Sequence, residues 1–156
     1  MVKSDTGTIA KAFDWPPVWL AVSLASVWSL GQLLPLPLFG GVGKGLGIAL
    51  GVGGLVLMVL AVQEMRRART TVIPHRVPAA LVTGGVFRFS RNPIYLGDSL
   101  LLLGATFYFD AVAGIVLVPL FMKVIEKRFI FAEEARLRAG FGENYDRWAS
   151  VVRRWV

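Results

Sequence analysis

Two short segments of the chain carry the residues best suited to chemistry. The first, residues 81–97, reads LVTGGVFRFSRNPIYLG and combines a pair of turn glycines with the side chains of Arg91 and Tyr95. Glycine lets a backbone turn sharply and approach a ligand without a Cβ in the way. The second segment carries the adjacent carboxylates Glu133 and Glu134. Together these groups predict a polar site that can bind a small charged molecule.

The end of the first segment has the features of a helix start. Asn92 is a residue type that caps helices, and Pro93 at the first helical position lacks only an N–H that would be unpaired anyway. We therefore expect a helix to begin at Pro93 directly after a polar loop. The structural alternative is an ordinary basic loop between two membrane helices, in which these residues have no ligand.

The two glutamates lie in a charged segment whose apolar residues still recur at helical spacing. Ile130, Glu133, Glu134 and Leu137 occur at i, i+3, i+4 and i+7, so both carboxylates share a face with apolar neighbours. Glu134 can pair with Arg138 one turn further on, which would make it structural. That leaves Glu133 as the stronger candidate for binding a ligand.

Composition places the chain in a membrane. The hydrophobic share is 55% in only 156 residues, and the mean hydropathy is +0.62; this apolar content exceeds that of an ordinary soluble domain. The net charge of +7 comes from basic residues between and after apolar runs, which excludes nucleic-acid binding as its explanation. There is no cysteine, and the one histidine, His75, lies between prolines in a loop, so no metal site is expected.

The apolar runs predict an all-α integral membrane protein with one domain over residues 1–156. Four transmembrane helices are expected at residues 15–34, 42–63, 94–109 and 111–125. A polar loop follows at residues 64–93, and interfacial helices at residues 126–156, the last from Glu143 to Trp155. Pro119 predicts a kink in the fourth helix.

Small residues recur every four positions in the second predicted helix. One row contains Gly43, Gly47 and Gly51, and such rows let helices pack closely. The alternative is that the glycines make room for a lipid tail. Asp98 lies one turn inside the third predicted helix, where an ionisable group is a candidate functional residue, although a carboxylate near a helix N-terminus is also tolerated.

The distribution of basic residues predicts the orientation. Two Lys and Arg residues precede the first span, one follows it, six lie between Glu64 and Pro93, none lies at Asp110, and eight lie from Lys123 on. Both termini, including the tail at residues 1–14, are therefore expected in the cytoplasm. The loop before Pro93 and the helix with Glu133 then lie on one side of the membrane, where a single site can use both.

In combination, these motifs resemble the bacterial branch of the isoprenylcysteine carboxyl methyltransferase family, which is related to the phospholipid methyltransferases. The similarity runs from Thr70 to Val156 through the loop LVTGG, the helix start RNPIYLG, the EE pair and the ending FGENYDRW, in the family's order. This resemblance implies methyl transfer from S-adenosylmethionine to a lipophilic small molecule or lipidated substrate at the cytoplasmic face of a bacterial inner membrane. It implies no metal.

The resemblance also implies site residues. Those expected to bind S-adenosylmethionine are Ala79, Ala80, Leu81, Val82, Phe87, Asn92, Pro93, Ile94, Tyr95 and Glu133. Glu133 would bind the methionyl end, and Asn92 stands where eukaryotic members have histidine. The family's substrate-linked basic residue aligns with Phe129, so the neighbouring Arg128 takes that role as a candidate.

The chemistry of the donor leads to the same kind of site. The sulfonium of S-adenosylmethionine is already activated for methyl transfer. The enzyme therefore needs chiefly to align the donor and the acceptor in line and to exclude water. Arg91 or a backbone N–H at Pro93 can hold the cofactor's carboxylate, and Phe87 and Tyr95 can pack on adenine or the sulfonium. A carboxylate that accepts the methyl group needs no strong base. An amine or thiol acceptor must also lose a proton, and the candidates to take that proton are Glu134, Asp98 and water.

Two other functions fit the same sequence. A phospholipid amine or small-thiol methyltransferase would have the same donor site and a different acceptor end. A non-catalytic membrane protein would use these loops for assembly and bind no cofactor. Neither the acceptor nor the oligomeric state follows from the residues.

Overall fold

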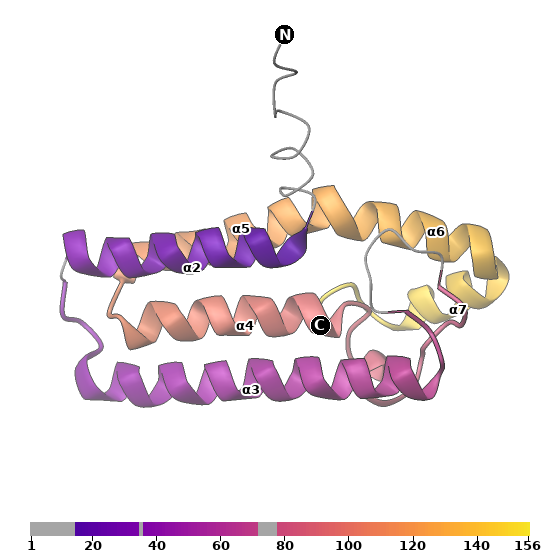
Figure 1. Ribbon diagram of the computed structural model, residues 1–156, viewed down its shortest axis with the longest axis horizontal. Coiled ribbons are helices and arrows are strands. Elements are labelled where there is room, and N and C mark those ends of the chain that lie inside the picture. Colours follow the sequence, from indigo (N-terminus) through magenta and orange to yellow (C-terminus); the bar gives the residue numbers. More distant parts are fainter. Residues whose placement is uncertain (1–14, 35, 72–77) are drawn as a thin grey trace, which may run out of the picture.

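Helix α4, Pro93–Tyr108, is the element around which the others are arranged. In the computed structural model, which describes residues 15–34, 36–71 and 78–156, α4 lies between α3 on one side and α2 and α5 on the other (Figure 1). No strand occurs in these described ranges, which confirms the all-α fold. The expectations for the tail at residues 1–14 and for His75 lie outside the described residues.

The first three apolar runs form helices close to the predicted positions. Helix α2 spans Pro16–Leu33 and α3 spans Gly40–Arg67, while α4 begins at Pro93 as predicted. Prolines stand at the start of α2 and α4, where the fixed φ angle suits the first turn. Helix α3 extends beyond the expected residues 42–63 at both ends.

One helix among the described residues, α3, is long and apolar enough to cross a membrane by length and composition. Helix α4 has 16 residues, and the fourth apolar run is divided between two shorter helical pieces. The four-span topology therefore stays a prediction.

The fourth apolar run continues without a break into the charged segment. A 3₁₀ stretch, η2 (Val112–Val116), leads into α5 (Leu117–Ile125), a π-helical turn η3 (Glu126–Ile130) and α6 (Phe131–Phe141). Pro119 lies near the start of α5, just after the change from 3₁₀ to α geometry, and the kink expected there stays a prediction. Figure 1 shows α5 and α6 as one rod that passes α4 and overhangs its N-terminal end. This overhang carries the glutamate pair towards the start of α4.

The chain ends in a short helix and an extended tail. Helix α7 covers Glu143–Val151, shorter than the expected range to Trp155, and Val152 has extended backbone angles. Gly142 has a φ of +51°, in the left-handed region that favours glycine, and it separates α6 from α7. The turn folds α7 back below α6 (Figure 1).

Glycines set the close approach of α3 and α4, as the small-residue row predicted. A Cβ at Gly47 would lie 2.5 Å from the Gly104 carbonyl oxygen, and a Cβ at Gly54 would lie 2.6 Å from that of Gly97. Gly51 belongs only marginally to this contact, because its nearest neighbour, on Leu101, is 3.9 Å from such a Cβ. The contacting row therefore follows the helix period as Gly43, Gly47 and Gly54, because steps of four and then seven residues stay on one face of a 3.6-residue helix.

Asp110 fixes the opposite end of the molecule from the glutamate pair. Its carboxylate accepts hydrogen bonds from the backbone N–H groups of Leu38, Phe39 and Gly40, at 3.0–3.1 Å. Gly40 is the first residue of α3 and Phe39 is its N-cap, and N–H groups at a helix start have no partner within the helix. Asp110 itself has a φ of +52°. These backbone hydrogen bonds, the first of them from Phe39, lower the pKa of Asp110 despite some desolvation.

Candidate active site

A cavity of about 490 Å³ lies where the ends of α2, α3 and α6 meet the start of α4. Its walls come from parts of the chain that are far apart in sequence. The lining includes Trp15, Pro16, Pro17, Leu20, Met58, Met65, Thr70, Thr71, Pro78, Ala80, Leu81, Val82, Phe87, Arg91, Asn92, Pro93, Ile94, Tyr95, Asp98, Glu133, Glu134, Arg136, Leu137, Tyr145 and Trp148. This volume is within the range of sites that hold a small organic ligand.

The structure brings nearly all of the predicted cofactor residues to this cavity. Of the ten, nine line it: Ala80, Leu81, Val82, Phe87, Asn92, Pro93, Ile94, Tyr95 and Glu133. The tenth, Ala79, is exposed and outside the lining, while the candidates Arg91 and Glu134 line the cavity as well. The predicted convergence of the loop, the helix start and the glutamate pair is therefore present.

A hydrogen bond joins two of these residues across the cavity. The Tyr95 hydroxyl donates to Oε1 of Glu133 at 2.8 Å, and Tyr95 is 7% exposed. Tyr95 belongs to the first turn of α4 and Glu133 to the first turn of α6. The bond holds one oxygen of the Glu133 carboxylate in a fixed orientation on the cavity wall.

The loop before α4 is held against the cavity by contacts with the end of α3 and the residues that follow it. Thr70 Oγ1 accepts hydrogen bonds from the backbone N–H groups of Ala79 and Ala80, at 3.0 and 3.4 Å. Gly85 has a φ of +55°, and a Cβ there would lie 2.7 Å from Cγ of Glu64. Only glycine suits both requirements, so this residue allows the loop to turn against the end of α3.

Helix α7 holds the same loop from the other side. Trp148 Nε1 donates to the carbonyl oxygen of Phe87 at 3.3 Å, and Phe87 is buried in the 3₁₀ turn η1 (Gly85–Arg88). Tyr145 is fully buried and packs edge-on against Trp148. Burial raises the pKa of Tyr145, which keeps its hydroxyl protonated.

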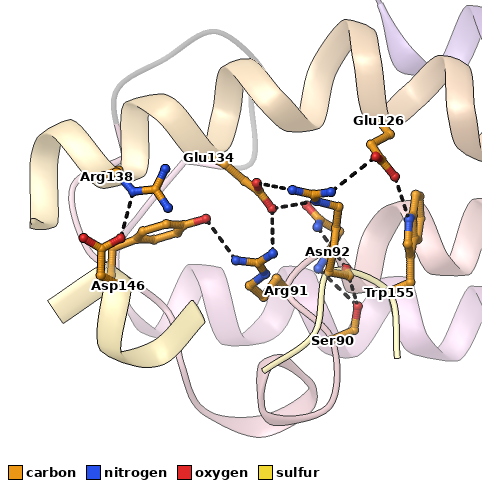
Figure 2. A network of polar contacts seen from close by, with 10 residues as sticks. Ser90, Arg91, Asn92, Glu126, Glu134, Arg138, Asp146 and Trp155 are labelled. Atoms are coloured by element: carbon orange, nitrogen blue, oxygen red, sulfur yellow. Dashed lines mark hydrogen bonds and ion pairs between the residues drawn. The ribbon is translucent and has the colours of Figure 1, made fainter. Parts of the chain in front are cut away.

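Glu134 is the centre of an ion-pair network that ties together three segments (Figure 2). It pairs with Arg91 Nη2 at 3.2 Å and with Arg154 Nη2 at 2.8 Å, and Arg154 also reaches Glu126 at 3.2 Å. The hydrogen bonds to Glu134 raise the pKa of Arg154. Glu126 in turn accepts a hydrogen bond from Trp155 Nε1.

The expected pairing of Glu134 with Arg138 is wrong. Arg138 Nε bonds to Oδ1 of Asp146 at 2.7 Å, across the turn between α6 and α7. Glu134 points instead towards Arg91 (Figure 2). It also pairs with Arg154 of the carboxy-terminal tail, because the backbone of that tail is bonded to Asn92 at the start of α4. Glu134 is therefore ion-paired within the protein, but with other partners than the one expected, and its catalytic role stays a prediction.

Asn92 occupies the N-cap position of α4 without capping it through its side chain. Its Nδ2 instead donates to the Arg154 carbonyl oxygen at 3.0 Å. Ser90 Oγ donates to the same oxygen at 3.3 Å, and the Arg91 N–H donates to the Arg153 carbonyl at 3.0 Å. The expected side-chain cap is therefore replaced by a contact with the carboxy-terminal tail.

Arg128, the candidate substrate residue, lies outside the cavity lining. Its guanidinium sits over the Trp19 ring, 5.2 Å from the centroid. Phe129, at the aligned position, is 2% exposed and belongs to the apolar core. The π-helical turn that contains both residues therefore contributes neither side chain to the cavity.

Two sets of cavity residues were not in the predicted site. The first is Tyr145 and Trp148 of the carboxy-terminal region, both of which lie in the FGENYDRW motif that carries the family resemblance. The second is the apolar wall, which is formed by Trp15, Pro16, Pro17, Leu20, Met58 and Met65. Nothing in the spacing of these apolar residues distinguishes them from ordinary helix-packing or lipid-facing positions. In the described ranges, no three His, Cys, Asp or Glu residues gather as a metal site would require.

Sequence comparison identifies the family. No curated protein sequence matches the chain significantly. Residues 42–144 match the phospholipid methyltransferase family. That range covers well over half of the 156 residues and contains the glycine-packed helices, the loop before α4 and the glutamate pair. The chain therefore belongs to the phospholipid methyltransferase family and is a membrane methyltransferase.

Proposed function

We propose that this protein transfers a methyl group from S-adenosylmethionine to a lipophilic acceptor at the cytoplasmic face of a bacterial inner membrane. The observation that carries the proposal is the hydrogen bond between Tyr95 and Glu133 on the wall of the cavity. It supports a carboxylate held in place for a cationic ligand, next to the loop that the family resemblance assigns to the same cofactor.

The donor fits the groups around this carboxylate. The methionyl ammonium would pair with Glu133, and aromatic Phe87 and Tyr95 can pack on adenine or the sulfonium. Arg91 is held by Glu134 and by the hydroxyl of Tyr145, at 3.2 and 3.4 Å. Its Nε is buried with no hydrogen-bond partner among the described residues. A fixed guanidinium of this kind can receive the methionyl carboxylate.

The chain contributes positioning and exclusion of water to the reaction. S-adenosylmethionine supplies an electrophilic methyl group when bound. Phe87, Tyr145 and Trp148 contribute aromatic surface to the cavity lining, and the carboxy-terminal tail is bonded to Asn92 at the start of α4. A dry cavity strengthens the charge interactions that hold both reactants and prevents hydrolysis.

The apolar wall supports a lipophilic acceptor. Pro17 and Leu20 of α2 and Met58 and Met65 of α3 line the cavity, although α2 and α3 pack on different sides of α4. An acceptor with a hydrocarbon chain can place that chain between these two helices. We place the termini and the charged helices in the cytoplasm because the basic residues gather at this end.

Two kinds of acceptor head group fit the cavity. A carboxylate such as that of isoprenylcysteine can pair with Arg136, a cation of the lining that is not part of the Glu134 network. An amine is favoured by a different observation, the buried carboxylate of Asp98 in the cavity lining. A small thiol has no group in the lining that specifically favours it.

The test is methyl transfer by the full chain in lipid vesicles. Isotopically labelled S-adenosylmethionine is supplied with a farnesylated cysteine, a long-chain primary alkylamine or a long-chain alkylthiol as acceptor. The proposal predicts labelled product from at least one lipophilic acceptor and loss of that product in Glu133→Gln. A folded protein that neither binds the donor nor labels any acceptor would contradict it and favour a role in membrane assembly.

A further inference from the structure

The carboxy-terminal tail is bound along its backbone to the residues that lead into α4. The N–H of Arg91 donates a hydrogen bond to the carbonyl oxygen of Arg153 at 3.0 Å. The next carbonyl oxygen, that of Arg154, accepts hydrogen bonds from Ser90 Oγ at 3.3 Å and from Asn92 Nδ2 at 3.0 Å. These contacts fix the position of the tail beside the start of α4, and they place the Arg154 side chain next to the glutamate pair of α6.

The Arg154 guanidinium holds the Glu134 carboxylate by two bonds. Arg154 Nε donates to Oε1 of Glu134 at 3.0 Å, and Nη2 donates to Oε2 at 2.8 Å. Two parallel bonds between a guanidinium and a carboxylate fix the plane of both groups. The guanidinium also pairs through Nη1 with Glu126 at 3.2 Å, and it lies over the Phe131 ring, 5.0 Å from the centroid. The tail therefore sets the orientation of the Glu134 carboxylate.

Arg91 meets this carboxylate through one nitrogen only. Its Nη2 lies 3.2 Å from Oε1 of Glu134, and its Nη1 donates to the Tyr145 hydroxyl at 3.4 Å. Arg91 lines the cavity, whereas Arg154 does not. Because a two-point pair is the preferred geometry of arginine with a carboxylate, a Glu134 released by Arg154 would turn to Arg91 and occupy more of its N–H groups.

We propose that Arg154 is a positioning residue for the methyl donor, because it holds Glu134 in an orientation that leaves the Arg91 guanidinium open to the donor's carboxylate. This inference rests on the proposed function, in which Arg91 receives the methionyl carboxylate of S-adenosylmethionine. Arg154 itself does not touch the donor, so its effect is confined to the end of the donor that Arg91 binds. The adenosine and the ammonium of the donor should be bound equally well without it.

The experiment uses two ligands that differ only in the carboxylate. Calorimetry measures the binding of S-adenosylhomocysteine and of its decarboxylated form, in which a propylamine replaces the amino-acid end, to the full chain in detergent. Both ligands keep the adenosine and the ammonium proposed for Glu133, but only the first can bind Arg91 through a carboxylate. The variants are Arg154→Gln and Arg154→Lys, and the control is Arg153→Gln, which removes one positive charge from the neighbouring exposed side chain.

We expect Arg154→Gln to raise the Kd of S-adenosylhomocysteine roughly 10-fold, the effect of one hydrogen bond between charged groups. The Kd of the decarboxylated ligand should not change. Arg154→Lys keeps the charge but cannot form two parallel bonds, so it should show a smaller rise with the same ligand selectivity. Arg153→Gln should bind both ligands like the wild type. If Arg154→Gln does not fold, the lysine variant provides the same comparison of ligands.

The contrary outcomes separate this inference from the proposed function. Equal weakening of both ligands in the folded Arg154 variants would show that Arg154 only supports the fold, and unchanged binding of S-adenosylhomocysteine would show that Arg91 is positioned without the tail. Equal affinity of the wild type for the two ligands would refute recognition of the carboxylate by Arg91 and leave the donor function intact. Binding of neither ligand by the folded wild type would refute both proposals.

Discussion

The hydroxyl oxygen of Tyr95 lies 2.8 Å from Oε1 of Glu133, which joins the first turn of α4 to the first turn of α6 across the cavity. The two residues are 38 positions apart in the chain. The hydrogen bond fixes one carboxylate oxygen of Glu133 on the cavity wall, to which the loop that precedes α4 also contributes. A donor bound between loop and glutamate would contact both helices.

Tyr95→Phe should weaken donor binding while leaving the fold intact. The substitution removes only the hydroxyl, so Glu133 loses the hydrogen bond that orients it. A bond of this kind to a charged group contributes about 1.5–3 kcal/mol, which corresponds to a roughly 10- to 100-fold increase in Kd. Calorimetric titration with S-adenosylhomocysteine measures the change. Equal affinity in the variant would show that the hydroxyl has no part in orienting the glutamate for binding.

Glu134→Gln should destabilise the protein strongly, because Arg91 and Arg154 lose a shared carboxylate. The Glu134 and Arg91 side chains are each 14% exposed, so water compensates little. We expect the free energy of unfolding to fall by roughly 2–4 kcal/mol, as for a partly buried charge left without its partner. Denaturant or thermal unfolding in detergent provides the measurement.

The matched control is Arg138→Leu. It removes an ion pair of similar length with Asp146, but those side chains are 59% and 55% exposed. Exposed pairs contribute less than about 1 kcal/mol. If both variants had equally small effects, the Glu134 network would not be what holds the carboxy-terminal tail to the start of α4.

The parts of the site that follow local rules could be predicted from the sequence. Pro93 begins α4 because proline is suited to a helix start, and the glutamate pair lies on a helix because its apolar neighbours recur at helical spacing. The small-residue row of α3 also predicted close packing, and the residues that resemble the family converge on one cavity.

The parts of the site that depend on long-range contacts could not be predicted from the sequence. The Arg154 carbonyl is bonded by Asn92, 62 positions earlier, and Asp110 caps a helix 70 or more positions away. Neither contact leaves a periodic signal in the sequence. Glu134 pairs with Arg154, and Arg138 pairs with Asp146, instead of Glu134 with Arg138. These pairs depend on the turn at Gly142 and on the path of the carboxy-terminal tail.

Gly47→Ala should destabilise the contact between α3 and α4. The new Cβ would lie 2.5 Å from the Gly104 carbonyl oxygen, a backbone atom that can move only if the helices separate. Overpacking of this kind costs about 1–3 kcal/mol. Gly53→Ala in the same helix is the control, because its Cβ meets nothing within 4 Å. The control should be neutral or stabilising by up to about 1 kcal/mol through helix propensity. Melting temperatures in one detergent compare the pair, and a reversed order would contradict the packing described for α3.

The stabilising effect of Asp110 should disappear in acid. Its pKa is lower in the folded protein than its ordinary value of 3.8, because backbone N–H groups bond to the ionised form. The contribution to stability is therefore fully present above that ordinary value and is lost as the pH falls through the folded pKa. Asp110→Asn should melt at a lower temperature than the wild type at neutral pH, and the difference should shrink below pH 3.8. A difference that is the same at all pH values would show that charge is not involved.

The most direct test of the central claim is calorimetric titration of S-adenosylhomocysteine into the detergent-solubilised wild type, Glu133→Gln and Glu143→Gln. Glu143 is an exposed acid of α7 outside the cavity lining, so its variant controls for the loss of one negative charge. The account predicts equal binding by the wild type and Glu143→Gln, and a roughly 10- to 100-fold weaker affinity in Glu133→Gln. No binding by a folded wild type, or unchanged binding in Glu133→Gln, would contradict it.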